Sequence, residues 1–360
     1  MNNFTNQLLR WFAENGRSLP WRETRDPYAV WLSEVILQQT RIQQGMAYWQ
    51  RFIQRWPTVE QLAAATEDEV LREWQGLGYY SRARNLHFAA KQIVEMGGFP
   101  HTYAEIRTLK GVGDYTAAAI ASIAFDEPHA VVDGNVYRVL ARHFGIDTPI
   151  NTTNGKKTFT ALAQSLLPPK QASAFNQAMM DFGAIQCTPQ SPRCVVCPLQ
   201  ETCDALHTGR IDTLPVKEKK LQVKTRRLTY IYIRCNGYTA IRKRPAGDIW
   251  QGLWELVAPS NSPEWGRTPN PSFLDTPPIR GKMEGGFEVR IPADSIKVRE
   301  NVRHVLTHRI LLADFYLWVT DERPSLPEEY VWVKEEDLDR YAKPRLIEIL
   351  LESLPKGIDS

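Results

Sequence analysis

Apolar residues recur at helical spacing through residues 1 to about 205. The longest stretch, VWLSEVILQQTRIQQGMAYWQRFI (30–53), keeps this spacing for about six turns and predicts helix throughout. Short connections that contain Gly and Pro separate the helical stretches and indicate a compact helical domain. The other predicted helices are EDEVLREWQGL (67–77), SRARNLHFAAKQIVEM (81–96), YTAAAIASIAF (115–125), NVYRVLARHF (135–144) and FNQAMMDFGAI (175–185).

The hydrophobic pattern changes near Ile211. Residues 216–227 carry six Lys or Arg against one Glu and predict a linker. The segment LTYIYIRCNGYTAIRKR (228–244) has β-rich runs on both sides of an Asn-Gly pair, which is a hairpin signal. ILLADFYLWVT (310–320) predicts a further strand, and the last residues return to a helical pattern. The sequence therefore predicts a helical domain over 1–210, a linker over 211–227 and an α/β domain over 228–360.

Composition narrows the function classes only slightly. A length of 360 residues suffices for two domains with separate cores, and 24% charged residues is ordinary for a globular protein. No apolar run approaches the ~18 residues of a membrane span, and the first residues show no secretory signal. A net charge of +3 is too small to indicate nucleic-acid binding by itself. Any case for DNA binding therefore rests on where the charges lie.

The stretch LKGVGDYTAAAIAS (109–122) places Gly111 and Gly113 directly before a predicted helix. A nucleotide-binding P-loop needs four residues between its glycines and a Lys-Ser/Thr pair after them, and neither is present. Glycines before a helix leave backbone N–H groups free to contact a phosphate, with Asp114 as a candidate cap. A turn that merely joins two helices explains the pattern as well, so the turn alone decides nothing.

Four of the five cysteines lie within one short segment, CTPQSPRCVVCPLQETC. Six, two and five residues separate them, whereas zinc sites usually show two close pairs of ligands. Four thiolates on one loop suit a [4Fe–4S] cluster, with zinc or disulfides as the alternatives. The predicted ligands are Cys187, Cys194, Cys197 and Cys203.

Together, the glycine turn and this cysteine spacing resemble the helix-hairpin-helix DNA glycosylase superfamily that includes endonuclease III. Over essentially the whole chain, and most densely before residue 205, the sequence is similar to MutY-type adenine DNA glycosylases. The stretches that carry this similarity are LPWR (19–22), WLSEVILQQT (31–40), GLGYYSRARNL (76–86), VDGNVYRVLAR (132–142) and FNQAMMDFGA (175–184).

The resemblance implies a fold and a substrate. The expected fold is an all-helical helix-hairpin-helix glycosylase domain with an iron–sulfur cluster loop (187–203), followed by a Nudix-like α/β domain. Its helical part would form two subdomains with the active site between them. These enzymes remove adenine mispaired with 8-oxoguanine, so the expected partner is double-stranded DNA with adenine opposite 8-oxoguanine or guanine. A monomer without membrane attachment is expected.

By resemblance, Glu34 is the general acid that protonates N7 of adenine. Its predicted helix has apolar neighbours, and burial there would raise the pKa of its carboxyl group. Asp133 would stabilise, or briefly bond, the anomeric carbon of the sugar, with Asn135 in support. The structural alternatives are a surface carboxylate for Glu34 and a helix N-cap for Asp133.

Tyr115 occupies the position where strand-cleaving members of the superfamily carry a lysine. That lysine forms a Schiff base with the sugar, which tyrosine cannot do. The resemblance therefore implies base removal without efficient lyase activity. The Tyr115 hydroxyl could still donate a hydrogen bond to Asp133 and orient it, or the ring could simply pack in the core.

Other matched positions concern base recognition and strand separation. Trp21, Arg22 and Gln177 match the lining of the adenine pocket in this family, and Arg and Gln suit purine edges. A base must leave the duplex to reach such a pocket, so other residues must fill the gap. Gln39 and Tyr79 match these wedge elements, with core packing as the alternative for Tyr79.

GDIWQGLWELV (247–257) resembles the Nudix-like domain that reads the damaged guanine in these enzymes. The residues that follow lack the glutamate array with which Nudix hydrolases bind magnesium, so recognition without hydrolysis is expected. Relatives commonly carry a Phe-Ser-His signature where this chain has Leu306-Thr307-His308. Thr307 keeps a hydroxyl group, and His304 and His308 are further candidates in this strand-adjacent loop, with a purely structural role as the alternative for both.

Three other functions compete with adenine removal. An endonuclease III-like enzyme for oxidised or mismatched pyrimidines would be expected to carry lysine rather than Tyr115. A DNA-scanning protein without activity would not need both Glu34 and Asp133, and a nucleotide-pool Nudix hydrolase would need the missing glutamates. The sequence therefore favours a monofunctional adenine glycosylase, cytoplasmic and bacterial in type, associated with the nucleoid through DNA.

Overall fold

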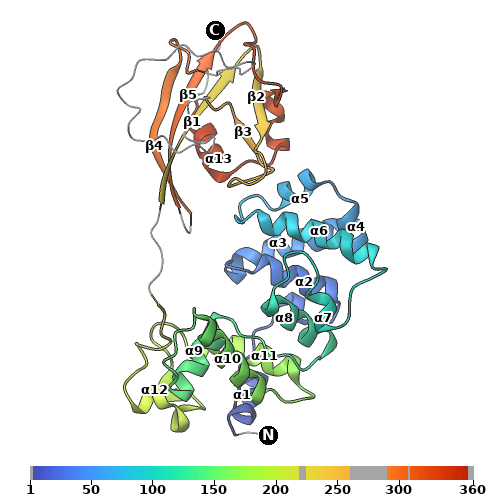
Figure 1. The fold of residues 1–360 in the computed structure, drawn as a ribbon, viewed down its shortest axis with the longest axis vertical. Coiled ribbons are helices and arrows are strands. Elements are labelled where there is room, and N and C mark those ends of the chain that lie inside the picture. Colours follow the sequence, from blue (N-terminus) through green and yellow to red (C-terminus); the bar gives the residue numbers. More distant parts are fainter. Residues whose placement is uncertain (1–2, 219–223, 260–289, 307–308, 356–360) are drawn as a thin grey trace. The chain divides into compact units, whose positions relative to one another are not determined.

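The computed structural model describes residues 3–218, 224–259, 290–306 and 309–355. It divides into two compact units, Met1–Ala65 with Arg84–Lys220 and Thr66–Ala83 with Leu221–Ser360. The first unit is helical, and the second contains all strands of the described ranges (Figure 1). The sequence pattern gave no sign that residues 66–83 group with the C-terminal part.

Several helices of the first unit begin at a residue whose side chain caps them. Pro27 occupies the first turn of α2, and the Asp26 side chain accepts a hydrogen bond from the Tyr28 amide. None of the helices in the described ranges is long and apolar enough to cross a lipid bilayer. The described helices are α1 (Asn3–Asn15), η1 (Pro20–Arg22), α2 (Pro27–Ile36), α3 (Ile42–Arg55), α4 (Val59–Ala64), α6 (Ser81–Glu95), α7 (Tyr103–Ile106), α8 (Asp114–Phe125), α9 (Gly134–Phe144), α10 (Thr153–Leu166), α11 (Ala172–Asp181), η2 (Phe182–Gln186), η3 (Cys194–Val196), η4 (Gln200–Thr202) and α12 (Asp204–His207). The first residues of α6 belong to the second unit.

The predicted helix over 30–53 is wrong in one respect, because the structure breaks it into α2 and α3. The break lies between Ile36 and Ile42, where Gln39 has a φ of +56°. A non-glycine residue in this left-handed region ends helical hydrogen bonding. Apolar periodicity continues across the break, which explains why the pattern conceals it. The break places a short turn next to the pocket described below.

Two packed groups of helices make up the first unit. In one, α2 and α8 lie side by side, and the small side chains of α8, such as Ala117 and Ala121, are fully buried and allow close approach (Figure 1). In the other, α1, α9, α10 and α11 share a core that includes Leu8, Leu140 and Phe175. This arrangement brings the last turn of α2 and the first turn of α8 near the start of α9 and the last turn of α11.

The glycine turn before α8 has the geometry that favours glycine. Gly111 has a φ of +79°, and a Cβ atom there would lie 2.7 Å from the Cβ atom of Asn85. Gly113 is the N-cap of α8 and leaves that helix end without a side-chain cap. The prediction that Asp114 caps the helix is wrong, since Asp114 is the first helical residue and pairs with Arg107.

Within the described ranges, the second unit contains two three-stranded sheets and one C-terminal α-helix, besides helix α5 (Glu67–Glu73). The first sheet has the order β1-β5-β4, with β1 (Lys224–Arg234) parallel to β5 (Arg309–Val319) and β4 (Ile296–Leu306) antiparallel to β5. The second has the order β3-β2-β6, formed by β3 (Trp254–Leu256), β2 (Tyr238–Lys243) and β6 (Tyr330–Lys334). Helix α13 (Arg345–Glu352) packs its Leu346 and Leu350 into a core with Phe315 of the first sheet.

The predicted Asn-Gly hairpin turn forms, but its two strands enter different sheets. Asn236 and Gly237 have φ values of +51° and +76°, and Cys235 and Tyr238 exchange both backbone hydrogen bonds across the turn. Beyond that bridge β1 pairs with β5, whereas β2 pairs with β3 and β6. Turn residues specify only the local reversal, so the sequence could not indicate this separation.

Candidate active site

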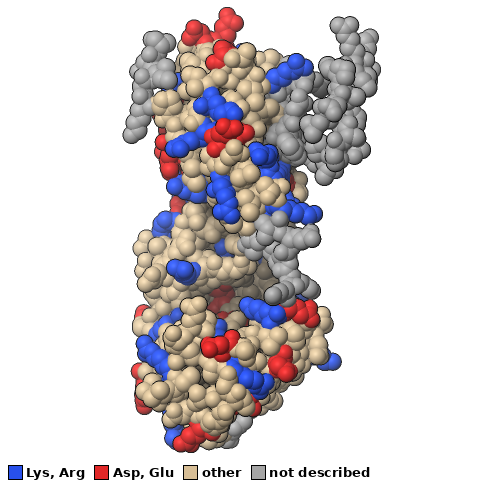
Figure 2. Space-filling model, turned by 90° about the vertical axis from the view of Figure 1, so that its left-hand side faces the viewer, with Lys and Arg blue, Asp and Glu red and all other residues tan. Residues whose placement is uncertain are grey.

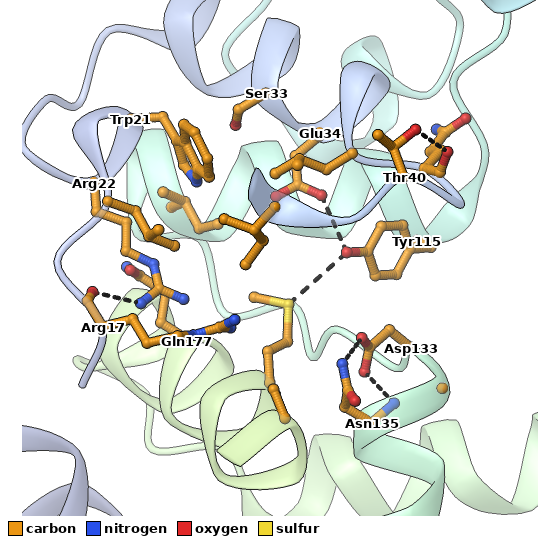
Figure 3. Close-up of a pocket in the computed structure, with 18 of the residues that line it drawn as sticks. Arg17, Trp21, Arg22, Ser33, Glu34, Thr40, Tyr115, Asp133, Asn135 and Gln177 are labelled. Atoms are coloured by element: carbon orange, nitrogen blue, oxygen red, sulfur yellow. Dashed lines mark hydrogen bonds between the residues drawn. The ribbon is translucent and has the colours of Figure 1, made fainter. Parts of the chain in front are cut away.

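A cavity of about 600 Å³ opens in the first unit between α2 and α8 on one side and α9 and α11 on the other. This volume is within the range of ligand-binding pockets. Basic and acidic side chains are intermixed on the molecular face shown in Figure 2, and a hollow in that face has acidic side chains on its floor. Figure 3 shows that the pocket brings together most of the residues selected from the first domain's sequence. Those that line it are Trp21, Arg22, Glu34, Gln39, Tyr115, Asp133, Asn135 and Gln177.

Glu34 projects from α2 into this pocket (Figure 3). Its helical neighbours Val30 and Trp31 are almost entirely buried, so the carboxyl group emerges from an apolar surface. Burial raises the pKa of Glu34 from 4.5 to about 7, a hydrogen bond from Tyr115 partly opposes this, and the charge of Asp133 adds to it. Glu34 can therefore hold a proton near neutral pH, as a general acid must.

Tyr115 reaches the pocket from the first turn of α8 and contacts Glu34, whereas the sequence suggested a contact with Asp133. Its hydroxyl donates to Oε2 of Glu34 over 3.1 Å and lies 3.8 Å from Sδ of Met180. The expected hydrogen bond from Tyr115 to Asp133 is replaced by this contact. Burial raises the pKa of Tyr115 well above its usual value, so the phenol remains a donor. Sequence spacing did not reveal which carboxylate α8 would face.

Asp133 is the N-cap of α9, so the alternative that predicted a capping role for Asp133 is correct. Its Oδ1 accepts from the backbone amides of Asn135 and Val136, and its Oδ2 accepts from Nδ2 of Asn135 over 2.8 Å. Burial raises the pKa of Asp133 despite these hydrogen bonds. The carboxylate also lines the pocket, so capping fixes its position without removing it from the cavity.

Asn135 is held in turn by Arg138, which sequence reasoning did not select. Arg138 donates to Oδ1 of Asn135 over 2.8 Å and to the carbonyl of Gly183 over 2.7 Å. It also donates to the carbonyl of Cys187, so one guanidinium connects the pocket with the cysteine segment. Its place one turn after Asn135 on α9 was visible in the sequence, but its partners were not.

The end of the pocket away from Tyr115 is formed by Trp21, Arg22 and Gln177 (Figure 3). Trp21 is buried and packs edge-on against Trp49, with ring centroids 5.7 Å apart. Nε2 of Gln177 donates to Ser173, which leaves its carbonyl oxygen available. An aromatic wall beside a guanidinium and an amide suits a planar heterocycle with polar edges.

The two wedge candidates share an unusual backbone conformation. Gln39 and Tyr79 have φ values of +56° and +49°, in the region that non-glycine residues rarely adopt. Gln39 is exposed at the pocket lining, and Tyr79, in the second unit, exposes 44% of its surface. Strained residues of this kind concentrate at functional sites.

The four clustered cysteines surround one small cavity and form no disulfide. Arg142 of α9 braces this segment: it donates to the carbonyls of Thr188 and Pro189, and its Nη1 lies 3.5 Å from Sγ of Cys187. No group of three or more His, Cys, Asp or Glu side chains within the described ranges is placed to hold a single metal ion.

In the second unit, His304 lies on strand β4 itself. The prediction that His304 lies in a loop next to a strand is wrong. Its ring packs against Trp250 with centroids 5.8 Å apart, and burial lowers the pKa of His304. Glu255 is buried and is bound by Arg242 and Arg244, so this carboxylate is engaged by two guanidiniums. Thr307 and His308 lie outside the described residues.

Comparison with known proteins shows the family to which the chain belongs. Residues 32–169 match the HhH-GPD superfamily base excision DNA repair protein, and residues 229–353 match the NUDIX domain. An adenine DNA glycosylase of Buchnera aphidicola subsp. Baizongia pistaciae is 36% identical over 256 residues, which cover 70% of this chain and 72% of that protein. The chain belongs to the adenine DNA glycosylase family.

A further adenine DNA glycosylase and a solved structure of another DNA glycosylase are also similar to this chain. An adenine DNA glycosylase of Rattus norvegicus is 45% identical over 226 residues, and the match spans 59% of this chain but only 44% of that protein. A structure of a thermostable thymine-DNA glycosylase is 31% identical, with a TM-score of 0.53, over 57% of this chain and 95% of that one. The predicted helix-hairpin-helix domain followed by a Nudix-like domain is thereby confirmed.

The raised pKa of Glu34 predicts that ionisation of this carboxyl group lowers the free energy of unfolding. The folded-state pKa lies above the unfolded value, so the folded protein loses stability as pH rises from 4.5 through about 7. The side chain of the Glu34→Gln variant cannot ionise. As pH rises from 4 to 9, the free energy of unfolding of this variant is therefore expected to rise by up to about 3 kcal/mol relative to that of the natural chain. Urea unfolding at several pH values measures this difference. A difference that does not change with pH would contradict the burial argument.

Proposed function

We propose that this chain removes adenine from duplex DNA by hydrolysing its N-glycosidic bond. The observation that carries the proposal is one pocket that holds Glu34, with its pKa near 7, and Asp133 on opposite walls. Cleavage of a glycosidic bond needs a proton for the leaving group and a negative charge for the sugar cation. The family membership of the chain supports adenine as the leaving base.

Glu34 supplies the proton in this proposal. The proton passes to N7 of adenine while the bond between N9 and C1′ breaks and its electron pair remains on the base. Tyr115 donates to Glu34 and so helps to hold the carboxyl group in one orientation. Trp21, Arg22 and Gln177 bind the base, consistent with their place at the far end of the pocket.

Asp133 stabilises the positive charge that develops at C1′. Its carboxylate is fixed by three hydrogen bonds from Asn135 and Val136, so it does not need to reorganise during the reaction. A water molecule then adds its oxygen to C1′ and passes a proton to Asp133. The products are free adenine and an intact strand with an abasic site, because Tyr115 offers no amine for strand cleavage.

The natural lesion in this proposal is adenine opposite 8-oxoguanine or guanine. The C-terminal unit would read the opposite base without hydrolysing nucleotides, through His304 together with Thr307 and His308. Gln39 and Tyr79 would fill the gap left by the flipped adenine, for which their exposed, left-handed positions are suitable. The turn at Gly111 and Gly113, where α8 begins without a side-chain cap, would hold a phosphate of the strand.

Cys187, Cys194, Cys197 and Cys203 would bind a [4Fe–4S] cluster. Four thiols around one cavity fit such a cluster better than a single ion, and Arg142 braces the segment that carries them. The cluster would have a structural role, joined to the active site through Arg138. Analysis of iron and acid-labile sulfide in the purified chain tests this assignment.

Incubation with a panel of substrates tests the proposed function. The panel contains duplexes with adenine opposite 8-oxoguanine, guanine or thymine, thymine opposite guanine, an oxidised pyrimidine, and free 8-oxo-dGTP. Release of adenine from the 8-oxoguanine and guanine duplexes is expected, with little from the adenine–thymine pair. Release of pyrimidine bases would favour an endonuclease III-like activity, and hydrolysis of the nucleotide would favour a Nudix hydrolase.

A further inference from the structure

A buried carboxylate beside the pocket, Asp181 at the end of α11, has no part in the mechanism above. Its side chain exposes no surface. It accepts from the backbone N and Nε of Arg17 over 2.8 and 2.9 Å, and from Nη1 and Nη2 of Arg22 over 2.8 Å each. One carboxylate thus holds two guanidiniums in fixed orientations.

Both arginines line the same pocket as Glu34. Of the side chains that line it, Glu34 and Asp133 are the carboxylates. A guanidinium released from Asp181 would therefore find its next anionic partners at the reacting centre. An arginine paired with a carboxylate lowers the pKa of that carboxyl group by about one to three units. Such a pair would leave Glu34 ionised near neutral pH.

We propose that Asp181 is a positioning residue that holds Arg17 and Arg22 at the base-binding end of the pocket, so that neither pairs with Glu34. Figure 3 shows both arginines at that end, with Glu34 facing Tyr115 instead. The inference rests on the proposed function, because it takes Glu34 to be the proton donor.

The charges around Glu34 are consistent with this arrangement. Burial and Asp133 at the start of α9 raise the pKa of Glu34, whereas Tyr115 of α8 and Arg22 of η1 lower it. Burial alone would raise the pKa of Asp181, but the hydrogen bonds from Arg22 and Arg17 lower it overall. Asp181 therefore stays ionised and balances part of the charge that would otherwise act on Glu34.

The test is the pH dependence of single-turnover adenine excision by the full chain with its cluster, using a duplex with adenine opposite 8-oxoguanine. Asp181→Asn is expected to shift the alkaline limb of the profile toward lower pH by about one unit or more. Asp181→Glu, which keeps the charge, is expected to retain most of the natural profile. Adding Arg22→Gln to Asp181→Asn is expected to move the limb back, although the rate stays low.

A control and two outcomes separate the possibilities. Glu335→Gln breaks an ion pair with Arg234 in the other unit and is expected to leave the profile unchanged. No excision by the natural chain would contradict the proposed function itself. Normal excision by the natural chain, with an unshifted alkaline limb in folded Asp181→Asn, would overturn only the inference about Asp181.

If Asp181→Asn does not fold, Arg22→Gln alone decides the matter. With Asp181 in place, loss of Arg22 is expected to move the alkaline limb by less than about one pH unit. A rise of more than about one unit would show that Arg22 pairs with Glu34 even in the presence of Asp181, which would overturn the inference.

Discussion

Replacing Glu34 by glutamine is expected to slow adenine excision by a factor of ~10²–10⁴, the usual contribution of a positioned general acid. Glutamine keeps the size and hydrogen-bonding shape of the side chain but has no acidic proton to transfer. The measurement is the single-turnover rate at pH 6, with enzyme in excess over a duplex that contains one adenine opposite 8-oxoguanine.

The control for this change is Glu14→Gln, the same substitution on the exposed surface of α1. Because Glu14 does not line the pocket, its variant is expected to excise adenine at the natural rate. DNA affinity of Glu34→Gln is expected to stay close to that of the natural chain. A Glu34→Gln rate within threefold of the natural rate would assign the proton to another donor.

Replacing Asp133 by asparagine is expected to reduce excision by a factor of ~10²–10³, the loss typical of one preorganised electrostatic contact. Asparagine is also a good N-cap, so α9 should keep its start and the pocket its shape. The measured effect then reports the missing negative charge near C1′. Single-turnover rates and thermal unfolding of the same preparation provide the comparison.

Thr152→Ala is the matched control for capping. The Thr152 side chain caps α10 by accepting from the Gly155 amide, outside the pocket. Its loss is expected to lower the unfolding free energy by about 1 kcal/mol without slowing excision. If Asp133→Asn lost stability to the same extent as Thr152→Ala and kept its excision rate, Asp133 would be a cap and nothing more.

The proposed catalytic residues could be selected from the sequence because they lie in motifs whose local structure is simple. Glu34 lies on a helix whose neighbours are apolar, and Asp133 directly precedes a helix, so burial and capping followed from the pattern. Family resemblance then gave these two carboxylates their roles. The glycine turn and the cysteine segment were recognisable for the same reason, since their spacing is itself the signal.

Contacts between distant segments could not be predicted. Tyr115 faces Glu34 rather than Asp133, which depends on how α8 packs against α2. Asp181 lies 159 residues from Arg22 in sequence, so their ion pair leaves no local pattern. A lone acidic residue between Met180 and Phe182 was the available sign, because a buried carboxylate needs cationic partners.

The central claim is base removal without strand cleavage, and one assay tests it most directly. Duplex with a single adenine opposite 8-oxoguanine is incubated with excess enzyme, and equal samples are analysed with and without hot alkali. Strand breaks that appear only after alkali are the predicted result, because Glu34 and Asp133 release the base while Tyr115 leaves the abasic site intact. Breaks without alkali, or no breaks in either sample, would contradict the account.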